Sequence, residues 1–123
     1  MDGSLRLLIG ACIYVAFADR ELDREERRVL VELIDKRVAL PPGTVDRFIV
    51  EVLTEMALEE PLEWLREAAQ DANLEATRDA LVCAVEEARS HGVHQIERER
   101  VREVADALGF DAGDADALLG ARG

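Results

Sequence analysis

The chain has 123 residues, of which 49% are hydrophobic, 34% are charged and only 4% are aromatic. This length fits a single domain over residues 1–123, with a core that needs no metal or disulfide crosslink, and the hydrophobic content excludes a disordered acidic tail. The formal net charge of −12 repels nucleic-acid phosphates and anionic membranes over most of the surface, and it favours cations and basic partner segments.

The first predicted element is an apolar helix over residues 5–18, which is almost uncharged after Arg6. A helix that is apolar on all sides is normally buried. The small residues at its end superficially fit a secretory cleavage site, but Asp2 offsets Arg6 before the apolar run, where a signal peptide would carry positive charge. The run is also shorter than the roughly 20 residues that span a bilayer. We therefore expect a buried central helix in a cytoplasmic protein.

An acidic connection follows over residues 18–26 (ADRELDREE), and a second, amphipathic helix continues to about residue 37. Asp23 is placed to accept hydrogen bonds from the first free N–H groups of that helix. Glu26 stands three residues later, which is the spacing of a capping box. The connection is therefore expected to be a tight turn whose carboxylates face the start of the second helix.

The rest of the chain repeats apolar residues at three- and four-residue spacing, and no segment alternates at period two. Pro and Gly residues break this pattern, with Pro61 suited to the first turn of a helix. Asn73 is a candidate N-cap and Gly109 a candidate C-terminal cap. The later helices carry their inward apolar residues over 45–56, 62–69, 81–88, 96–108 and 118–119. We expect an all-α fold, a compact bundle of six or seven helices around the buried N-terminal helix.

The motif over residues 18–26 resembles that of the TerB-like (tellurite resistance protein B-like) family of small all-helical bacterial proteins. Its signature is alanine, aspartate, usually glycine, a variable residue, an aliphatic residue, a capping residue and a glutamate. Arg20 stands where the glycine is usual, so the turn is expected to differ here. The resemblance implies two related helical hairpins, divalent-metal binding at the acidic turn and a bacterial stress response of the tellurite-resistance kind.

A weak internal duplication agrees with this resemblance. The shift that places Cys12 on Cys83 also places Glu26 on Glu97 and keeps the apolar spacing of the two hairpins in register. The second copy lacks the aspartate of the motif. Any two amphipathic hairpins share helical spacing, so the duplication supports the family only together with the motif.

Asp19, Asp23 and Glu26 are the candidate metal ligands. Carboxylate oxygens suit hard divalent cations such as Ca²⁺ or Mg²⁺. An EF-hand is excluded, because position 6 of the loop would be Arg24 and position 12 would be Leu30. The alternative is that these carboxylates only cap the second helix.

The two cysteines and two histidines do not suit a zinc site. His91 lies about 12 Å beyond Cys83 along one helix axis at 1.5 Å per residue, whereas zinc ligands converge to about 2.0–2.3 Å from one point. We expect His91 and His94 in a turn, and Cys12 and Cys83 as small buried hydrophobes. Their matching places in the duplication permit a close approach, which leaves an accidental disulfide open.

No catalytic residue is assigned. The sequence has no serine or cysteine nucleophile with a recognisable partner, no glycine-rich phosphate loop and no Glu-x-x-His motif of a di-iron bundle. The charge runs over 24–28 and 97–100 are expected on solvated helix faces.

Two functions remain open from the sequence. The first is a non-enzymatic TerB-like module that binds a divalent cation at the acidic turn and acts as an adaptor in a bacterial stress response. The second is a purely protein-binding scaffold or homodimerisation module with no metal site. Both predict a protein partner, with neither nucleic-acid binding nor membrane insertion.

Overall fold

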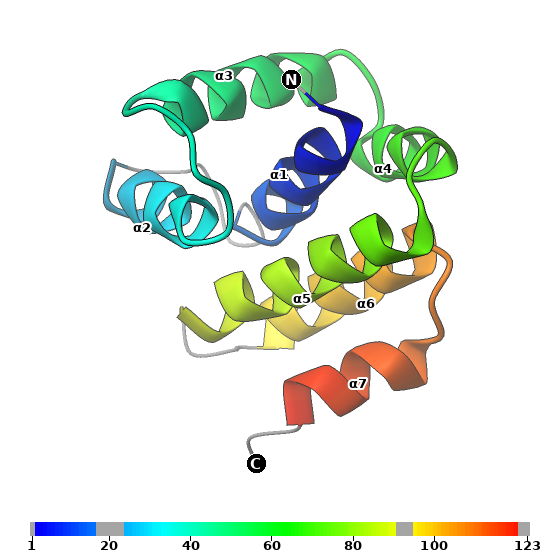
Figure 1. Cartoon of the computed structure of the whole chain (residues 1–123). Helices are drawn as coiled ribbons and strands as arrows, with labels where there is room; N and C mark the ends of the chain where they lie inside the picture. Colours follow the sequence, from blue (N-terminus) through cyan, green and yellow to red (C-terminus); the bar gives the residue numbers. More distant parts are fainter. Residues whose placement is uncertain (1, 17–23, 91–94, 121–123) are drawn as a thin grey trace.

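The computed structural model describes residues 2–16, 24–90 and 95–120, which contain seven α-helices and no strand. The helices are α1 (Gly3–Ala16), α2 (Arg24–Asp35), α3 (Thr44–Ala57), α4 (Pro61–Gln70), α5 (Leu74–Ser90), α6 (Gln95–Ala107) and α7 (Ala112–Gly120). Figure 1 shows α1 inside the bundle, with α2, α3 and α4 around one side of it and α5 and α6 along the other. α7 packs against α5 and α6 on the outside. The predicted all-α bundle is confirmed.

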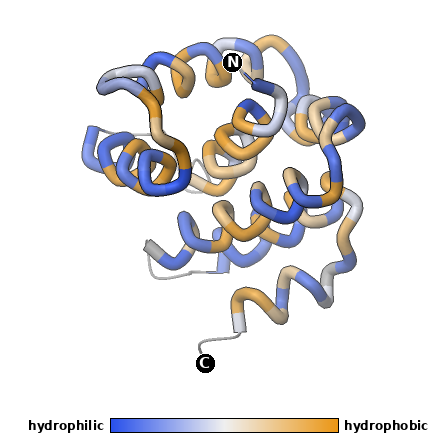
Figure 2. The backbone as a smooth tube through the Cα atoms, viewed as in Figure 1, coloured by the Kyte–Doolittle hydropathy of each residue, from blue (hydrophilic) through white to orange (hydrophobic). Residues whose placement is uncertain are grey.

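α1 occupies the centre because its sequence offers almost no polar side chain. Every residue from Leu7 to Ala16 is buried, and the helix contacts α2, α3, α4, α5 and α6. Figure 2 shows the hydrophobic residues of the surrounding helices turned largely toward this centre. Burying a side chain such as Ile9 or Ile13 contributes roughly 1.5–3 kcal/mol, so α1 is a major part of the core. Of the predicted span 5–18, residues 17 and 18 lie outside the described part of the chain.

α5 is the closest partner of α1. Its predicted inward residues are all buried, and they include the small side chains Ala84 and Ala88. Ala80 and Cys83 are also buried on the same helix. Small side chains let two helix axes approach closely, because the distance between packed helices depends on the side chains at the contact.

The predicted helix caps of α5 and α6 are present. The Asn73 side-chain oxygen accepts a hydrogen bond from the Ala76 N–H at 2.8 Å. Gly109 ends α6 with φ +89°, a left-handed conformation that glycine adopts without a Cβ clash. The N–H of Phe110 then donates to the carbonyl of Ala105 at 2.8 Å, which is the hydrogen bond of a Schellman motif.

The starts of α3 and α4 also follow from their residues. α3 begins at Thr44, directly after Gly43, which has φ +84°. α4 begins at Pro61, where the missing N–H of proline costs nothing. The Glu60 carboxylate accepts a hydrogen bond from the Glu63 N–H at 2.9 Å and so caps this helix.

One expectation about the charge runs is wrong. Glu97 was expected on a solvated face but is only 2% exposed. α6 contacts α1, α4, α5 and α7, which leaves it a narrow solvent face. Helical spacing then places Glu97 on the same inner face as the buried Val101 and Val104. Glu87 on α5 is likewise fully buried.

Candidate functional site

The acidic connection joins the buried central helix to α2. α1 ends at Ala16 and α2 begins at Arg24, so α2 starts at the residue after the predicted N-cap. Asp19 and Asp23 lie outside the described residues. Glu26 is described: it lies in the first turn of α2 and is half-buried. A carboxylate at this position is favoured by the positive end of the helix dipole.

An ion pair with α3 and two buried apolar side chains hold α2 against the rest of the bundle. The Arg27 guanidinium donates to both carboxylate oxygens of Asp46 on α3, at 2.7 and 2.8 Å. Arg28 pairs with Glu25 and Glu32 on the same helix. Leu30 and Ile34 are fully buried and face the core. The backbone that carries Glu26 is therefore anchored to α3 and to the core.

The described part of the chain contains no cluster of three or more His, Cys, Asp or Glu side chains arranged to hold a metal ion. Of the three predicted ligands, only Glu26 belongs to this part, so the set formed by Asp19, Asp23 and Glu26 remains a prediction. His91 and His94 also lie outside it. Glu26 itself fits the requirement of a hard cation for a carboxylate oxygen.

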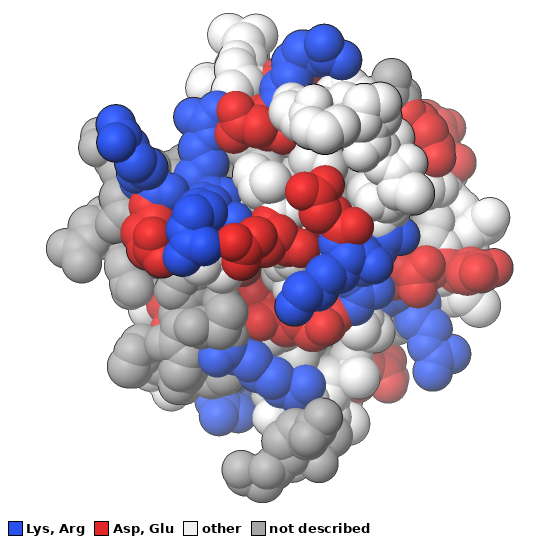
Figure 3. All heavy atoms as spheres, turned by 60° about the vertical axis from the view of Figure 1, so that its left-hand side comes forward, with Lys and Arg blue, Asp and Glu red and all other residues white. Residues whose placement is uncertain are grey.

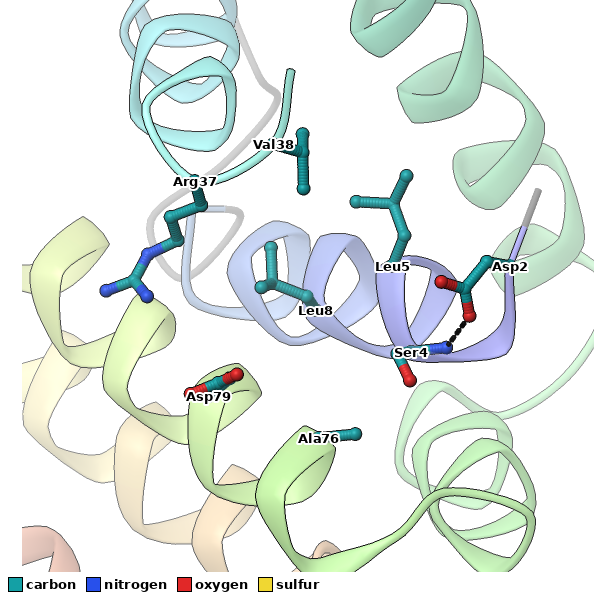
Figure 4. A pocket seen from close by; sticks show the side chains of 8 residues that line it. All are labelled: Asp2, Ser4, Leu5, Leu8, Arg37, Val38, Ala76 and Asp79. Atoms are coloured by element: carbon teal, nitrogen blue, oxygen red, sulfur yellow. Dashed lines mark hydrogen bonds between the residues drawn. The ribbon is translucent and has the colours of Figure 1, made fainter. Parts of the chain in front are cut away.

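A pocket of about 280 Å³ opens beside the first turns of α1. It is lined by Asp2, Ser4, Leu5, Leu8, Arg37, Val38, Ala76 and Asp79. Figure 4 shows Leu5 and Leu8 in the middle of this pocket, with Arg37 toward one end and Asp2 toward the other. The Asp2 carboxylate accepts a hydrogen bond from the Ser4 N–H at 2.8 Å, so it already serves as a cap of α1. The lining combines apolar side chains with charged side chains of both signs. Such a lining suits contact with a ligand or partner rather than acid–base chemistry.

The two cysteines meet in the core between α1 and α5. Both are fully buried, and the Cys12 thiol donates to Cys83 with the sulfur atoms 3.1 Å apart. Burial first, and the neighbouring Cys83 second, raise the pKa of Cys12 well above its usual range. The hydrogen bond from Cys12 lowers the pKa of Cys83 against the effect of burial, and the nearby Arg37 guanidinium lowers it further. The expected buried positions and close approach of the cysteines are confirmed.

A cluster of hydrogen-bonded side chains, which no sequence pattern indicated, joins α1, α3 and α4. The Glu55 carboxylate accepts hydrogen bonds from Arg6 Nε at 2.9 Å and from Trp64 Nε1 at 3.1 Å. The Arg6 guanidinium also lies over the Trp64 ring, 4.7 Å from its centroid. The hydrogen bonds from Arg6 and then Trp64 hold the pKa of Glu55 below its usual value, although burial opposes them. Residues 49 positions apart in sequence share no local pattern, so only the fold reveals this contact.

A second polar group joins α1 to α6. The Tyr14 hydroxyl donates to Glu103 at 2.8 Å, and the Arg100 guanidinium lies 4.6 Å from the centroid of the Tyr14 ring. Burial and the hydrogen bond to Glu103 raise the pKa of Tyr14 to about 12. Tyr14 and Arg100 also line a pocket of about 280 Å³ beside Met56 and Pro61.

Charges of opposite sign are interspersed on the face that carries α2. Figure 3 shows Lys and Arg side chains lying among Asp and Glu side chains there, not in a patch of one sign. Ion pairs between helices, such as Arg27 with Asp46 and Arg37 with Glu86, account for part of this arrangement. This face therefore offers no broad single-sign field to a partner.

Within the described ranges, no helix is both long enough and apolar enough to pass through a membrane.

These features define a small all-helical bundle built around a buried first helix, with an acidic connection leading to an anchored second helix. The family model of the tellurite resistance protein TerB matches residues 6–119. The chain therefore belongs to the TerB family, and the resemblance inferred from residues 18–26 is confirmed. Neither the curated proteins nor the solved structures compared with the chain include a match.

Proposed function

We propose that the chain is a non-enzymatic TerB module that binds Ca²⁺ or Mg²⁺ at its acidic connection and acts as a cytoplasmic adaptor in a bacterial stress response. One observation carries this proposal: the family match covers nearly the whole chain, and the structure sets Glu26 on an anchored first turn of α2. The ligands would be the carboxylates of Asp19, Asp23 and Glu26, which are oxygen donors of the kind that hard cations prefer.

A bound cation would stabilise the fold by neutralising negative charge between α1 and α2. Asp19, Asp23 and Glu26 are close together in the sequence of a chain with net charge −12, and their carboxylates would repel one another if they converged. A divalent ion held by ligands on both sides of the start of α2 would offset this repulsion. Because such an ion binds the folded state preferentially, it would stabilise the joined arrangement of α1 and α2.

The adaptor role calls for a surface that a partner protein can contact. Leu58 and Leu74 are 83% and 75% exposed, so each offers apolar side-chain surface that a partner could cover. Leu74 also lines a pocket of about 410 Å³ between α5 and α7, together with Phe110 and Leu118. The excess of acidic residues favours a partner with a basic segment around its apolar contact.

The second candidate is a protein-binding scaffold or homodimerisation module without metal. The pocket between α5 and α7 favours it, because this apolar surface is formed without any contribution from the acidic connection. In that case Asp23 and Glu26 would serve only as helix caps.

Calorimetric titration of the metal-free protein with Ca²⁺, Mg²⁺, Mn²⁺ and Zn²⁺ separates the two candidates. The variant Asp19→Asn removes one proposed ligand charge and keeps the size of the side chain. Asp35→Asn is the matched control, because Asp35 is exposed at the far end of α2. Binding heat that disappears in Asp19→Asn and persists in Asp35→Asn supports the cation site. The absence of binding by all four ions leaves the scaffold function.

A further inference from the structure

Cys12 and Cys83 lie close enough together to form a disulfide bond with little movement. Their sulfur atoms are 3.1 Å apart, closer than two sulfur atoms in ordinary van der Waals contact. A disulfide requires about 2.05 Å, so the two side chains need to move by only about 1 Å in total. The contact joins α1 to α5, the two helices that pack together most extensively in the core.

The two thiols are chemically unequal. Cys12 is the hydrogen-bond donor and Cys83 the acceptor. Charged groups also surround the pair: Arg37 from the end of α2 and Glu87 from α5. Cys12 has its pKa raised by burial, whereas Cys83 has its pKa lowered by the Cys12 hydrogen bond and the Arg37 guanidinium. A thiolate is the reactive form of cysteine, so Cys83 is the better nucleophile of the two.

The partly exposed Arg37 side chain lies on the solvent side of the two cysteines. Its guanidinium pairs with Glu86 on α5, and Figure 4 shows its side chain extending from the end of α2 toward α5. The Arg37 side chain is 27% exposed, and it borders the pocket lined by Leu8 and Val38. Arg37 therefore borders both this pocket and Cys83.

We propose that Cys83 and Cys12 form a hydroperoxide-sensing dithiol, in which Cys83 reacts first, Cys12 resolves the product and Arg37 supports the Cys83 thiolate. The Cys83 thiolate attacks the terminal oxygen of the hydroperoxide. An S–O bond forms, the O–O bond breaks, and the released hydroxide or alkoxide takes up a proton. Cys12 then attacks the Cys83 sulfur of the sulfenic acid. The S–S bond forms, the S–O bond breaks, and water leaves with the proton of Cys12. Two thiols are thus oxidised to one disulfide, and one peroxide is reduced.

A hydroperoxide is the oxidant that fits this site. Both sulfurs are fully buried, so a bulky disulfide such as that of glutathione cannot align with either of them without opening the core. Hydrogen peroxide is far smaller, and Arg37, which borders both the pocket and Cys83, is the side chain whose displacement would admit it. The product links α1 to α5 across a separation of 71 residues.

The test uses the intact native protein treated with hydrogen peroxide, and separately with oxidised glutathione, at neutral pH. The expected product with peroxide is a monomer lacking two hydrogen atoms, with no free thiol and a single peptide crosslink between Cys12 and Cys83. Oxidised glutathione should react far more slowly. Thiols that persist in the folded protein under peroxide, or a crosslink between two chains, would overturn the proposal. Faster reaction with glutathione disulfide would overturn the choice of oxidant.

Variants then assign the individual roles. Cys12→Ala should stop at a sulfenic acid on Cys83 that dimedone labels when the oxidised protein is unfolded in its presence, whereas Cys83→Ala should leave Cys12 unlabelled. Labelling of Cys12 in Cys83→Ala, without labelling of Cys83 in Cys12→Ala, would contradict the roles assigned to the two cysteines. Arg37→Gln should slow oxidation several-fold, because the loss of the guanidinium raises the pKa of Cys83 and so reduces its thiolate fraction. It should also move the pH profile of the rate upward. Arg78→Gln, an equal loss of charge on the exposed face of α5, is the matched control and should change neither. Equal oxidation rates in the wild type, Arg37→Gln and Arg78→Gln would show that Arg37 does not support the Cys83 thiolate.

Discussion

The indole ring of Trp64 lies against the backbone of Gly10, so closely that a Cβ atom added at Gly10 would overlap the ring. Gly10 is in the middle of α1, and Trp64 is 2% exposed on α4. Glycine within a helix costs up to about 1 kcal/mol relative to alanine, so its presence here requires a reason. The reason is that only a residue without a side chain lets the ring of α4 reach α1.

Replacing Gly10 by alanine should therefore destabilise the protein. The loss from overpacking, typically 1–3 kcal/mol, exceeds the gain of about 1 kcal/mol in helix propensity. Because Trp64 is the single tryptophan of the chain, its fluorescence should shift as the ring is displaced. Gly113→Ala is the control, because nothing lies within 4 Å of a Cβ at that position. A Gly10→Ala protein as stable as the wild type in urea would show that α4 adjusts freely.

Ile13 anchors the core from the next turn of α1. It is 1% exposed, so Ile13→Ala should lower the free energy of unfolding by roughly 2–5 kcal/mol through lost burial and the cavity left behind. Leu58→Ala, at a side chain that is 83% exposed, should change it by less than about 0.5 kcal/mol. Equal urea midpoints for the wild type and both variants would place α1 at the periphery of the fold.

The fold could be predicted from the sequence more fully than the site. The three- and four-residue spacing of apolar residues, together with Pro61, Asn73 and Gly109, predicted six or seven helices and several of their ends, and the described residues contain seven. Local patterns carry that information, because capping and helical periodicity depend on near neighbours. The fit of Gly10 against Trp64 depends on two helices packed in space, and periodicity alone could not predict it.

In the candidate site too, features that depend on the sequence pattern could be predicted, whereas contacts between residues on different elements could not. The duplication permitted a close approach of Cys12 and Cys83, and the structure places their sulfurs in contact. The Arg37 guanidinium beside Cys83 could not be predicted, because Arg37 follows the end of a helix that contributes no other charged group there. Burial of Glu97 was missed because the run was interpreted from its charge alone, although the helical spacing from Val101 and Val104 places Glu97 on the inner face. The motif over residues 18–26 indicated the family, which the match over residues 6–119 confirms.

The Glu55 carboxylate should give the protein an acid-sensitive contribution to stability. Its pKa in the folded state lies below the unfolded value, chiefly through the Arg6 hydrogen bond. The stabilisation is therefore present above the unfolded pKa and is lost as the pH falls through the folded pKa. The effect should be small, because the side chains of Arg6 and Glu55 are 36% and 40% exposed. Urea unfolding between pH 7 and pH 3 should lose part of its pH dependence in Glu55→Gln. The exposed Glu51→Gln serves as the control on the same helix, and an unchanged profile in Glu55→Gln would contradict this assignment.

The single tyrosine should ionise late. Burial and the Glu103 hydrogen bond raise the pKa of Tyr14 to about 12 from the model-peptide value of 10.0, although Arg100 acts in the opposite direction. A raised folded pKa means that the stabilisation is present below the unfolded pKa and is lost as the pH rises through the folded pKa. Ultraviolet absorbance of the phenolate measures this ionisation directly, since no other tyrosine contributes. Glu103→Gln should lower the pKa of Tyr14, because it replaces a negatively charged acceptor, which favours the protonated hydroxyl, with a neutral one. Half-ionisation near pH 10 in protein that circular dichroism shows to be folded would contradict the prediction.

Thermal melting with and without divalent cation tests the proposed cation site most directly. The account predicts that wild type melts at a higher temperature in millimolar Ca²⁺ or Mg²⁺ than in EDTA, by an amount equivalent to about 2.7 kcal/mol where the free ion reaches 100 times its dissociation constant. Asp19→Asn should lose that gain and melt as the wild type does in EDTA. Coincident melting curves for wild type in EDTA and in millimolar cation would contradict the cation site and leave a protein-binding TerB module.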